Sequence, residues 1–160
     1  MQSAVTATPQ EFAASKSSRE EGRWLFAAIA SLAVAGMIVS GISLQRHYAK
    51  SATKFCDVGE RFNCDIVNRS EYSSVMGIPV AGIGVVGYGV LMLLATLYRA
   101  QPTTPTRLLI ASAAGLVFAL YLTYIEGYVL NTWCILCLSS LLIITAITAL
   151  AGVVKARSRA

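Results

Sequence analysis

The residues with the clearest chemical potential in this sequence are its four cysteines, which occur as two pairs. Cys56 and Cys64 are separated by seven residues of a polar segment, and Cys134 and Cys137 form a C-x-x-C motif at the start of an apolar segment. Thiols three positions apart on a helix share a face, at a separation that a disulfide tolerates. Because thiols and disulfides exchange through mixed disulfides, a pair in a loop and a pair on a helix together predict a thiol–disulfide relay.

The C-x-x-C motif is expected to form the first turn of a helix. Cys134 then lies at the positive end of the helix dipole, which favours a thiolate and a lowered pKa. Cys137 lies one turn further in, about 4.5 Å along the helix axis. One sulfur facing an aqueous loop and one facing the membrane interior is the arrangement that electron transfer from a protein thiol to an apolar quinone needs.

Three other interpretations of the cysteines stay open. They could form two structural disulfides in a non-catalytic membrane scaffold, a four-cysteine zinc or iron–sulfur site, or buried thiols that act as small hydrophobic side chains. A metal site is disfavoured because C-x7-C is a poor ligand spacing and the second pair lies at the lipid boundary. The sequence therefore favours the relay, with the scaffold as its rival from another functional class.

The composition indicates that these cysteines are carried by an integral membrane protein. Hydrophobic residues make up 56% of the 160-residue chain and charged residues only 13%, whereas soluble domains carry about 25% charge. The apolar residues come in blocks long enough to cross a bilayer. No segment combines a dense basic patch with stacking aromatics, so we expect no binding of nucleic acid.

The predicted fold class is an all-α bundle of four transmembrane helices. The expected spans are about 24–44, 79–98, 108–129 and 134–154, with Pro79 in the first turn of the second and Asn131 or Thr132 as the N-cap of the fourth. A long non-cytoplasmic loop, 45–78, joins the first two spans. Residues 1–23 are expected to be a flexible cytoplasmic tail and residues 155–160 a basic cytoplasmic tail.

The basic residues predict how this bundle is oriented. Four spans place both termini and the turn at 99–107 on one side, where the Lys and Arg residues number three, two and three. The opposite side carries five, all in the long loop. The positive-inside rule therefore favours cytoplasmic termini. All four cysteines then fall on the non-cytoplasmic face, where disulfides persist.

Around these cysteines the chain resembles the vitamin K epoxide reductase family in its bacterial single-domain form. The matching pieces are Phe55-Cys56-Asp57-Val58-Gly59, Cys64, Ser70, the stretch from Gly77-Ile78-Pro79-Val80 to Gly87-Tyr88, and Trp133-Cys134-Ile135-Leu136-Cys137. They cover about residues 50–145. The joint order of C-x7-C, a serine six residues later, and a C-x-x-C on the last helix is specific, whereas a lone C-x-x-C is not.

The resemblance implies a disulfide-generating oxidoreductase of a bacterial inner membrane. Cys137 would reduce the quinone and Cys134 would be its resolving partner. Cys64 would attack a Cys134–Cys137 disulfide, and Cys56 would meet the external thiol. Ser70 matches a loop Ser or Thr that supports activity. Because many bacterial members carry a fused thioredoxin-like domain and this chain stops at Ala160, we expect a separate thioredoxin-like partner.

The resemblance also implies a quinone site. We expect it to be lined by Cys137, Val80, Gly84, Tyr88 and Leu141. Vertebrate members use an Asn at the start of the second helix and a Tyr one turn after the C-x-x-C to hydrogen-bond the quinone, and the matching positions here are Val80 and Leu141. This departure favours a simple quinone, such as ubiquinone or menaquinone, over an epoxide.

A second family of bacterial four-helix disulfide generators also uses quinone. It places its C-x-x-C in the first outside loop and its second cysteine pair in the later one. The order in this chain is the reverse, which argues against that family.

Three further features complete the sequence-based interpretation. Glu126 is the only charged residue between Arg107 and Lys155; it could deliver a proton to a reduced quinone or simply reach the membrane interface. The segment Gly82-Ile83-Gly84-Val85-Val86-Gly87 matches a dinucleotide-binding pattern but lacks the preceding strand, so close helix packing or room for a flat ligand explains it better. Asn68-Arg69-Ser70 is a glycosylation sequon that occurs often by chance.

Overall fold

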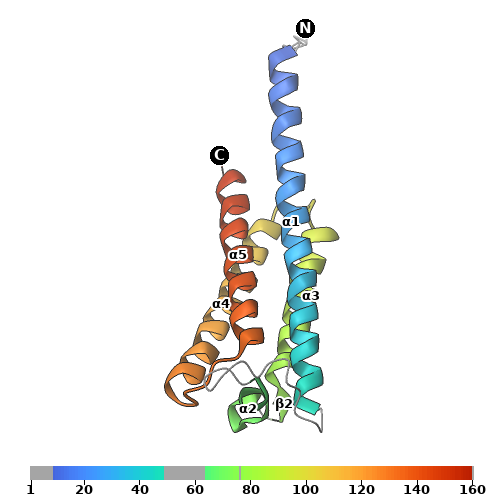
Figure 1. Ribbon diagram of the computed structural model, residues 1–160. Coiled ribbons are helices and arrows are strands. Elements are labelled where there is room, and N and C mark those ends of the chain that lie inside the picture. Colours follow the sequence, from blue (N-terminus) through green and yellow to red (C-terminus); the bar gives the residue numbers. More distant parts are fainter. Residues whose placement is uncertain (1–8, 49–63, 76, 160) are drawn as a thin grey trace.

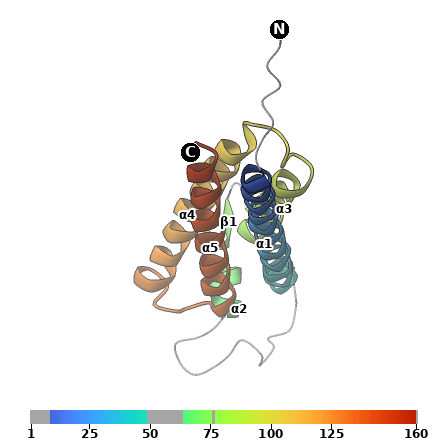
Figure 2. The same cartoon turned by 90° about the horizontal axis from the view of Figure 1, so that it is seen from above.

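The computed structural model describes residues 9–48, 64–75 and 77–159. Four long helices dominate the described part: α1 (Pro9–Tyr48), α3 (Val80–Thr96), α4 (Thr104–Tyr128) and α5 (Ile135–Arg157). Helix α3 lies along α1 and α4 lies along α5, and α1 also contacts α5 (Figures 1 and 2). A short helix α2 (Cys64–Arg69), a 3-10 turn η1 (Glu71–Ser73) and a hairpin of β1 (Ser74–Val75) and β2 (Ile78–Pro79) precede α3.

Three of the long helices are long and apolar enough to cross a membrane: the segment Gly22–Tyr48 of α1, then α4, then α5. Helix α3 is apolar but has 17 residues, at the lower limit for a span. The second expected span therefore corresponds to a shorter helix than 79–98. Many large apolar side chains are exposed along these helices, including Val86, Ile110, Val117 and Leu142, which implies contact with lipid.

The helix ends differ from the expected boundaries in ways that local chemistry explains. Helix α1 begins at Pro9, so residues 9–23 are helical rather than a flexible tail; eight of these fifteen residues are Ala, Glu, Lys or Arg, which favour helix. The same helix runs on to Tyr48, into the expected loop. Helix α4 starts at Thr104 rather than Leu108, because Pro105 fits the first turn of a helix. Helix α5 ends at Arg157.

A core of apolar side chains holds the four long helices together. Its buried members are Ile29 and Ala33 of α1, Tyr88, Leu91 and Ala95 of α3, Leu108 of α4, and Ile144, Ile147, Ala151 and Val154 of α5. Small residues let α1 and α3 approach closely. A Cβ at Gly36 would collide with the Tyr88 ring, and one at Gly84 would lie 2.7 Å from Ser40 Oγ. The close-packing explanation of the glycine-rich segment is thereby supported at Gly84.

Successive long helices run in opposite directions along the bundle (Figure 1). Helix α2, the hairpin and the N-terminal end of α5 therefore lie at the same end. The N-terminal end of α1 and the C-terminal end of α5 lie at the opposite end. The first of these ends carries the cysteines that the structure describes.

Candidate functional site

A tight turn between α4 and α5 builds the centre of the site. The backbone N–H of Leu130 donates to the Ile125 carbonyl at 3.0 Å, and that of Thr132 donates to the Glu126 carbonyl at 3.1 Å. Asn131 adopts a φ of 49°, in the left-handed region that Asn tolerates better than most residues. This turn reverses the chain within six residues. It brings the last turn of α4 beside the first turn of α5.

Cys134 is the N-cap residue of α5, with φ −107° and ψ 117°. Its backbone N–H donates to Glu126 Oε2 at 3.0 Å, and its carbonyl accepts the Leu138 N–H at 3.0 Å. The expected N-cap at Asn131 or Thr132 is therefore wrong. Those residues are used by the turn instead, and a side chain of α4 satisfies the first amide of the helix.

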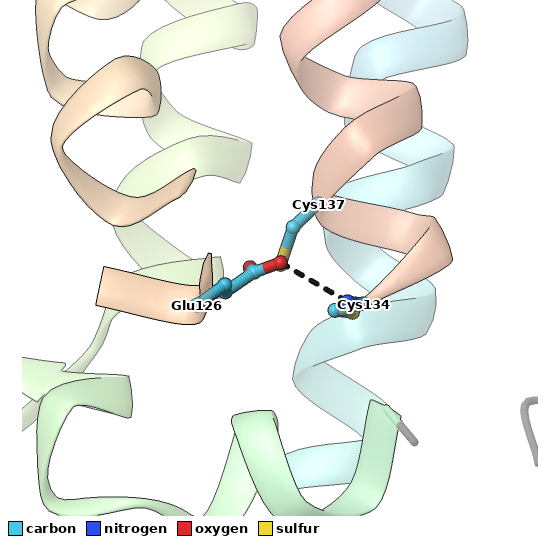
Figure 3. Close-up of side chains that lie close together, drawn as sticks. All are labelled: Glu126, Cys134 and Cys137. Atoms are coloured by element: carbon cyan, nitrogen blue, oxygen red, sulfur yellow. Dashed lines mark hydrogen bonds between the residues drawn. The ribbon is translucent and has the colours of Figure 1, made fainter. Parts of the chain in front are cut away.

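The Glu126 carboxylate and the sulfurs of Cys134 and Cys137 converge (Figure 3). One ligand-type atom from each lies within 4.8 Å of the other two. Glu126 points from the end of α4 toward Cys137, which projects from the first turn of α5. Glu126 is 2% exposed, so the interpretation in which it simply reaches the interface is wrong.

Cys64 joins this group from the other side of Cys134. Both residues are buried, at 1% and 0% exposure, and they pack with Val67 in one small cluster. The thiols of Cys64 and Cys134 lie within hydrogen-bonding reach. The structure therefore brings three of the four cysteines together. Cys56 lies outside the described residues.

The expected activation of Cys134 by the helix dipole is wrong. A hydrogen bond with the Cys137 thiol raises the pKa of the Cys134 thiol above its ordinary value; the hydrogen bond with Cys64 opposes this, and burial adds to it. As the N-cap residue, Cys134 has a sulfur enclosed by other thiols and apolar side chains. Desolvation and thiol neighbours outweigh the dipole at this position.

A cavity of about 370 Å³ lies among the four long helices and α2, within the size range of small-molecule sites. Most of its wall is apolar, with residues such as Leu91, Phe118, Leu122 and Ile144. Cys137 and Glu126 line it, whereas Cys134 and Cys64 do not. The two cysteines of the C-x-x-C motif thus face different surroundings: one faces the cavity and one faces Cys64.

The residues expected to line a quinone site are mostly found at this cavity. Val80, Gly84 and Tyr88 line it together with Cys137, but Leu141 does not. Ser140 lines the cavity in its place and binds the Tyr88 hydroxyl through both its carbonyl and its Oγ, each at 2.9 Å. Leu141, the position that the resemblance indicated, is the next residue along α5.

Helix α2 also carries Asn68, which stood out in the sequence only as part of a glycosylation sequon. Asn68 is 6% exposed and lines the cavity. Ser43 of α1 donates its hydroxyl to Asn68 Oδ1 at 2.8 Å, and His47 Nδ1 donates to the Asn68 carbonyl at 2.6 Å. Because Asn68 is four residues after Cys64, one face of α2 presents both, a spacing that could have revealed it.

Ser70 also lines the cavity, but its hydroxyl is used locally. It donates to the Val67 carbonyl at 2.8 Å, while the Ser70 carbonyl accepts the backbone N–H and the hydroxyl of Ser73. These bonds close the end of α2 and shape the turn that follows. Ser70 therefore lies at the site and stabilises the segment that holds Cys64 and Asn68.

Two buried polar side-chain atoms have no hydrogen-bond partner within the described ranges, Asn68 Nδ2 and Glu126 Oε1. Both side chains belong to residues that line the cavity. Buried polar atoms are normally satisfied, and each exception needs an explanation. A polar ligand in the cavity would provide one.

Comparison with known proteins agrees with this arrangement. A family model described as the vitamin K epoxide reductase family matches residues 27–151. A search among curated proteins gives no match. The match spans α1 from its middle, the α2 segment, α3, α4 and most of α5, and it implies a membrane oxidoreductase of redox or disulfide chemistry. The chain belongs to the vitamin K epoxide reductase family.

Proposed function

We propose that this protein oxidises thiols of a thioredoxin-like partner and passes the electrons to a membrane quinone, so that disulfide bonds form outside the cytoplasm. The observation that carries the proposal is the split environment of the C-x-x-C motif. Cys137 opens onto an apolar cavity, and Cys134 contacts Cys64. A relay that takes electrons from one side and delivers them to the other needs this division.

The residues around the cavity fit a quinone. Its wall offers an apolar surface for a flat ring, and Gly84 and Gly87 remove side-chain bulk on the α3 side. Asn68 Nδ2 offers a donor without a partner within the described part of the chain, suited to a quinone carbonyl oxygen. Ser43 occupies Oδ1 of the same amide, which directs the donor away from α1. A bound quinone supplies the two-electron acceptor for the cysteine pair.

In the proposed reaction the chain's own groups do the following. The Cys64 thiolate attacks Cys134 of a Cys134–Cys137 disulfide, which forms a Cys64–Cys134 mixed disulfide and releases Cys137 as a thiol. Cys56 then attacks Cys64, which releases Cys134 and leaves a Cys56–Cys64 disulfide for the partner to reduce. The reduced pair, Cys134 and Cys137, then transfers two electrons and two protons to the quinone, and the disulfide between the two cysteines forms again.

The orientation of the bundle and its membrane are part of the same proposal. The excess of basic residues at the termini favours a cytoplasmic location for them. The cysteines then lie on the periplasmic or extracellular face of a bacterial inner membrane, where a thioredoxin-like partner can reach them. A scaffold stabilised by two disulfides is the alternative function, and it gives no reason for an open cavity beside Cys137.

The Cys64–Cys134 contact can be tested by crosslinking. In a Cys56→Ser/Cys137→Ser variant only Cys64 and Cys134 remain, and mild oxidation with diamide is expected to join them in most molecules. The matched control is Cys56→Ser/Cys134→Ser, which leaves Cys64 and Cys137 and is expected to crosslink far less. Peptide mapping by mass spectrometry identifies the bond. Equal crosslinking in both variants, or none in the first, would contradict the relay order.

A further inference from the structure

Glu126 is an unusual residue for its position. It lies in the last turn of α4, is 2% exposed, and faces an apolar cavity and two thiols. A carboxyl group is costly to bury when it is ionised. Accepting the Cys134 N–H at the start of α5 would need only a neutral oxygen acceptor, such as that of Ser, Thr or Gln. The requirements of the helix end do not explain why the acceptor is a titratable acid.

The two carboxylate oxygens of Glu126 face different surroundings. Oε2 accepts the Cys134 N–H at 3.0 Å, which fixes the orientation of the group. Oε1 is buried and has no hydrogen-bond partner in the described part of the chain. The carboxylate lies within 4.8 Å of both sulfurs of the C-x-x-C motif, and within hydrogen-bonding reach of the Cys137 thiol. One oxygen is anchored, and the other can exchange a proton.

Among the residues that the structure describes, Glu126 is the carboxyl group that lines the cavity. Besides Cys137, the other titratable residues of the described lining are His47 of α1, Tyr72 of η1 and Tyr88 of α3, and this described lining includes no Lys, Arg or Asp. The His47 Nδ1 is engaged by the Asn68 carbonyl, and the Tyr88 hydroxyl by Ser140. From α2, Cys64 faces Cys134 rather than the cavity. Glu126 is the carboxyl group beside both thiols.

We propose, resting on the function above, that Glu126 is the catalytic residue that takes the thiol protons of the Cys134–Cys137 pair and passes them to the quinone oxygen in the cavity. Oxidation of the pair breaks two S–H bonds, forms one S–S bond and releases two electrons and two protons. The same two electrons and two protons convert one quinone to the quinol. Glu126 takes the Cys137 proton and releases it to one quinone oxygen, and then takes the Cys134 proton and releases it to the other, so that two protons are delivered and the carboxylate is restored at the end.

The test uses the full chain in detergent, reduced and freed of oxygen, and mixed once with a short-chain ubiquinone. Glu126→Gln keeps the shape and an oxygen acceptor for the Cys134 N–H but cannot take a proton. Thiol oxidation is expected to slow by about 10²–10⁴-fold near neutral pH, the usual contribution of a positioned acid or base. The rate should recover as the pH rises, because the thiols then ionise without Glu126. The control is Glu71→Gln, at an exposed carboxylate outside the cavity, which should leave the rate unchanged.

A second measurement does not depend on turnover. The infrared difference spectrum between the oxidised and reduced protein, prepared with chemical oxidant and reductant without quinone, should contain a carboxylic acid C=O band, because without quinone to receive it the last thiol proton stays on Glu126. That band should shift in Glu126→Asp and disappear in Glu126→Gln. A purely structural acceptor would give no such redox-linked band.

The outcomes separate this proposal from the proposed function. Quinone reduction by Glu126→Gln at the wild-type rate, or a wild-type spectrum without the band, would overturn the role of Glu126 and leave the relay standing. Failure of the wild-type protein to reduce any short-chain ubiquinone or menaquinone, with the band present, would instead overturn quinone as the acceptor. If Glu126→Gln does not fold, the wild-type and Glu126→Asp spectra still decide the matter.

Discussion

The middle of the bundle and its cysteine-bearing end use buried space in opposite ways. In the apolar core, Ile29, Leu108 and Ile147 are fully buried and belong to one cluster of apolar side chains. At the other end, buried positions hold Cys64, Cys134, Asn68 and Glu126. Two atoms of these polar side chains have no partner among the residues that the structure describes.

This difference separates stability from function. Apolar packing holds the helices together, and burying a polar atom without a partner works against folding. The polar end therefore carries a cost that the core does not. Buried polar atoms without a partner are expected where a bound ligand would complete their hydrogen bonds. The cavity beside Cys137 has room for such a ligand. Changes to the core should alter stability, and changes at the polar end should alter chemistry.

The largest effect on stability is expected from Ile147→Ala. Removing a fully buried Ile side chain at the helix interface should lower the free energy of unfolding by roughly 2–5 kcal/mol. The folded fraction should still reduce quinone at close to the wild-type rate. Thermal unfolding in detergent, together with turnover per folded molecule, checks both points. A variant of full stability, or one that folds but is inactive, would break the comparison.

A smaller effect, on binding, is expected from Asn68→Ala. Loss of one hydrogen bond to a quinone oxygen is worth about 1 kcal/mol, which corresponds to roughly a 5–10-fold increase in KM with little change in kcat. Ser43→Ala is the matched control, because it removes the other bond of the amide and leaves the Nδ2 donor in place. The stretching band of the quinone carbonyl in the bound state should change in Asn68→Ala. An unchanged band and KM would assign Asn68 a structural role only.

A third prediction concerns the Cys134 thiol. Because its hydrogen bond with Cys137 raises its pKa, Cys134 should be alkylated by iodoacetamide only at more alkaline pH than an ordinary thiol. Cys137→Ala removes the largest cause and should move the midpoint of the alkylation profile toward lower pH. The midpoint, rather than the maximal rate, is compared, since burial slows the reagent at every pH. A midpoint that stays in place would show that Cys137 does not control this thiol.

The smallest effect is expected from Leu141→Ala. Leu141 does not line the cavity, so the KM for quinone should change by less than about twofold. Ser140→Ala offers the contrast, because it removes the Oγ partner of the Tyr88 hydroxyl at the cavity wall. Steady-state titration with a short-chain quinone distinguishes the two. A larger effect from Leu141→Ala than from Ser140→Ala would favour a quinone position beside Leu141, as the resemblance to the family implied.

The sequence predicts the helical membrane character, the family and the convergence of the later cysteine pair with Cys64. These follow from apolar block length and from the order of the cysteines. Exact helix ends follow less well. The Thr104-Pro105 pair is compatible with both a turn and a helix start, and the segment 9–23 mixes helix-favouring Ala, Glu, Lys and Arg with Ser, Gly and Pro.

The roles of Asn68 and Glu126 depend on tertiary structure. Asn68 acquires its orientation only when α2 packs on Ser43 and His47 of α1, which are more than 20 residues away in sequence. Glu126 reaches Cys134 only because the turn at Asn131 folds α4 back on α5. The same packing encloses Cys134 and overrides the dipole argument. The spacing of Cys64 and Asn68 indicates only that α2 carries both, whereas the contacts themselves depend on how the helices pack.

In the proposed relay, electrons leave the protein at Cys137. The direct measurement is an anaerobic titration of fully reduced, purified protein with a short-chain quinone, in which quinol formed and thiols lost are counted together. We expect one quinol for each pair of thiols lost in the wild type, and none in a Cys137→Ser variant that keeps the wild-type thermal stability. Quinol formation by Cys137→Ser at the wild-type rate would contradict the relay.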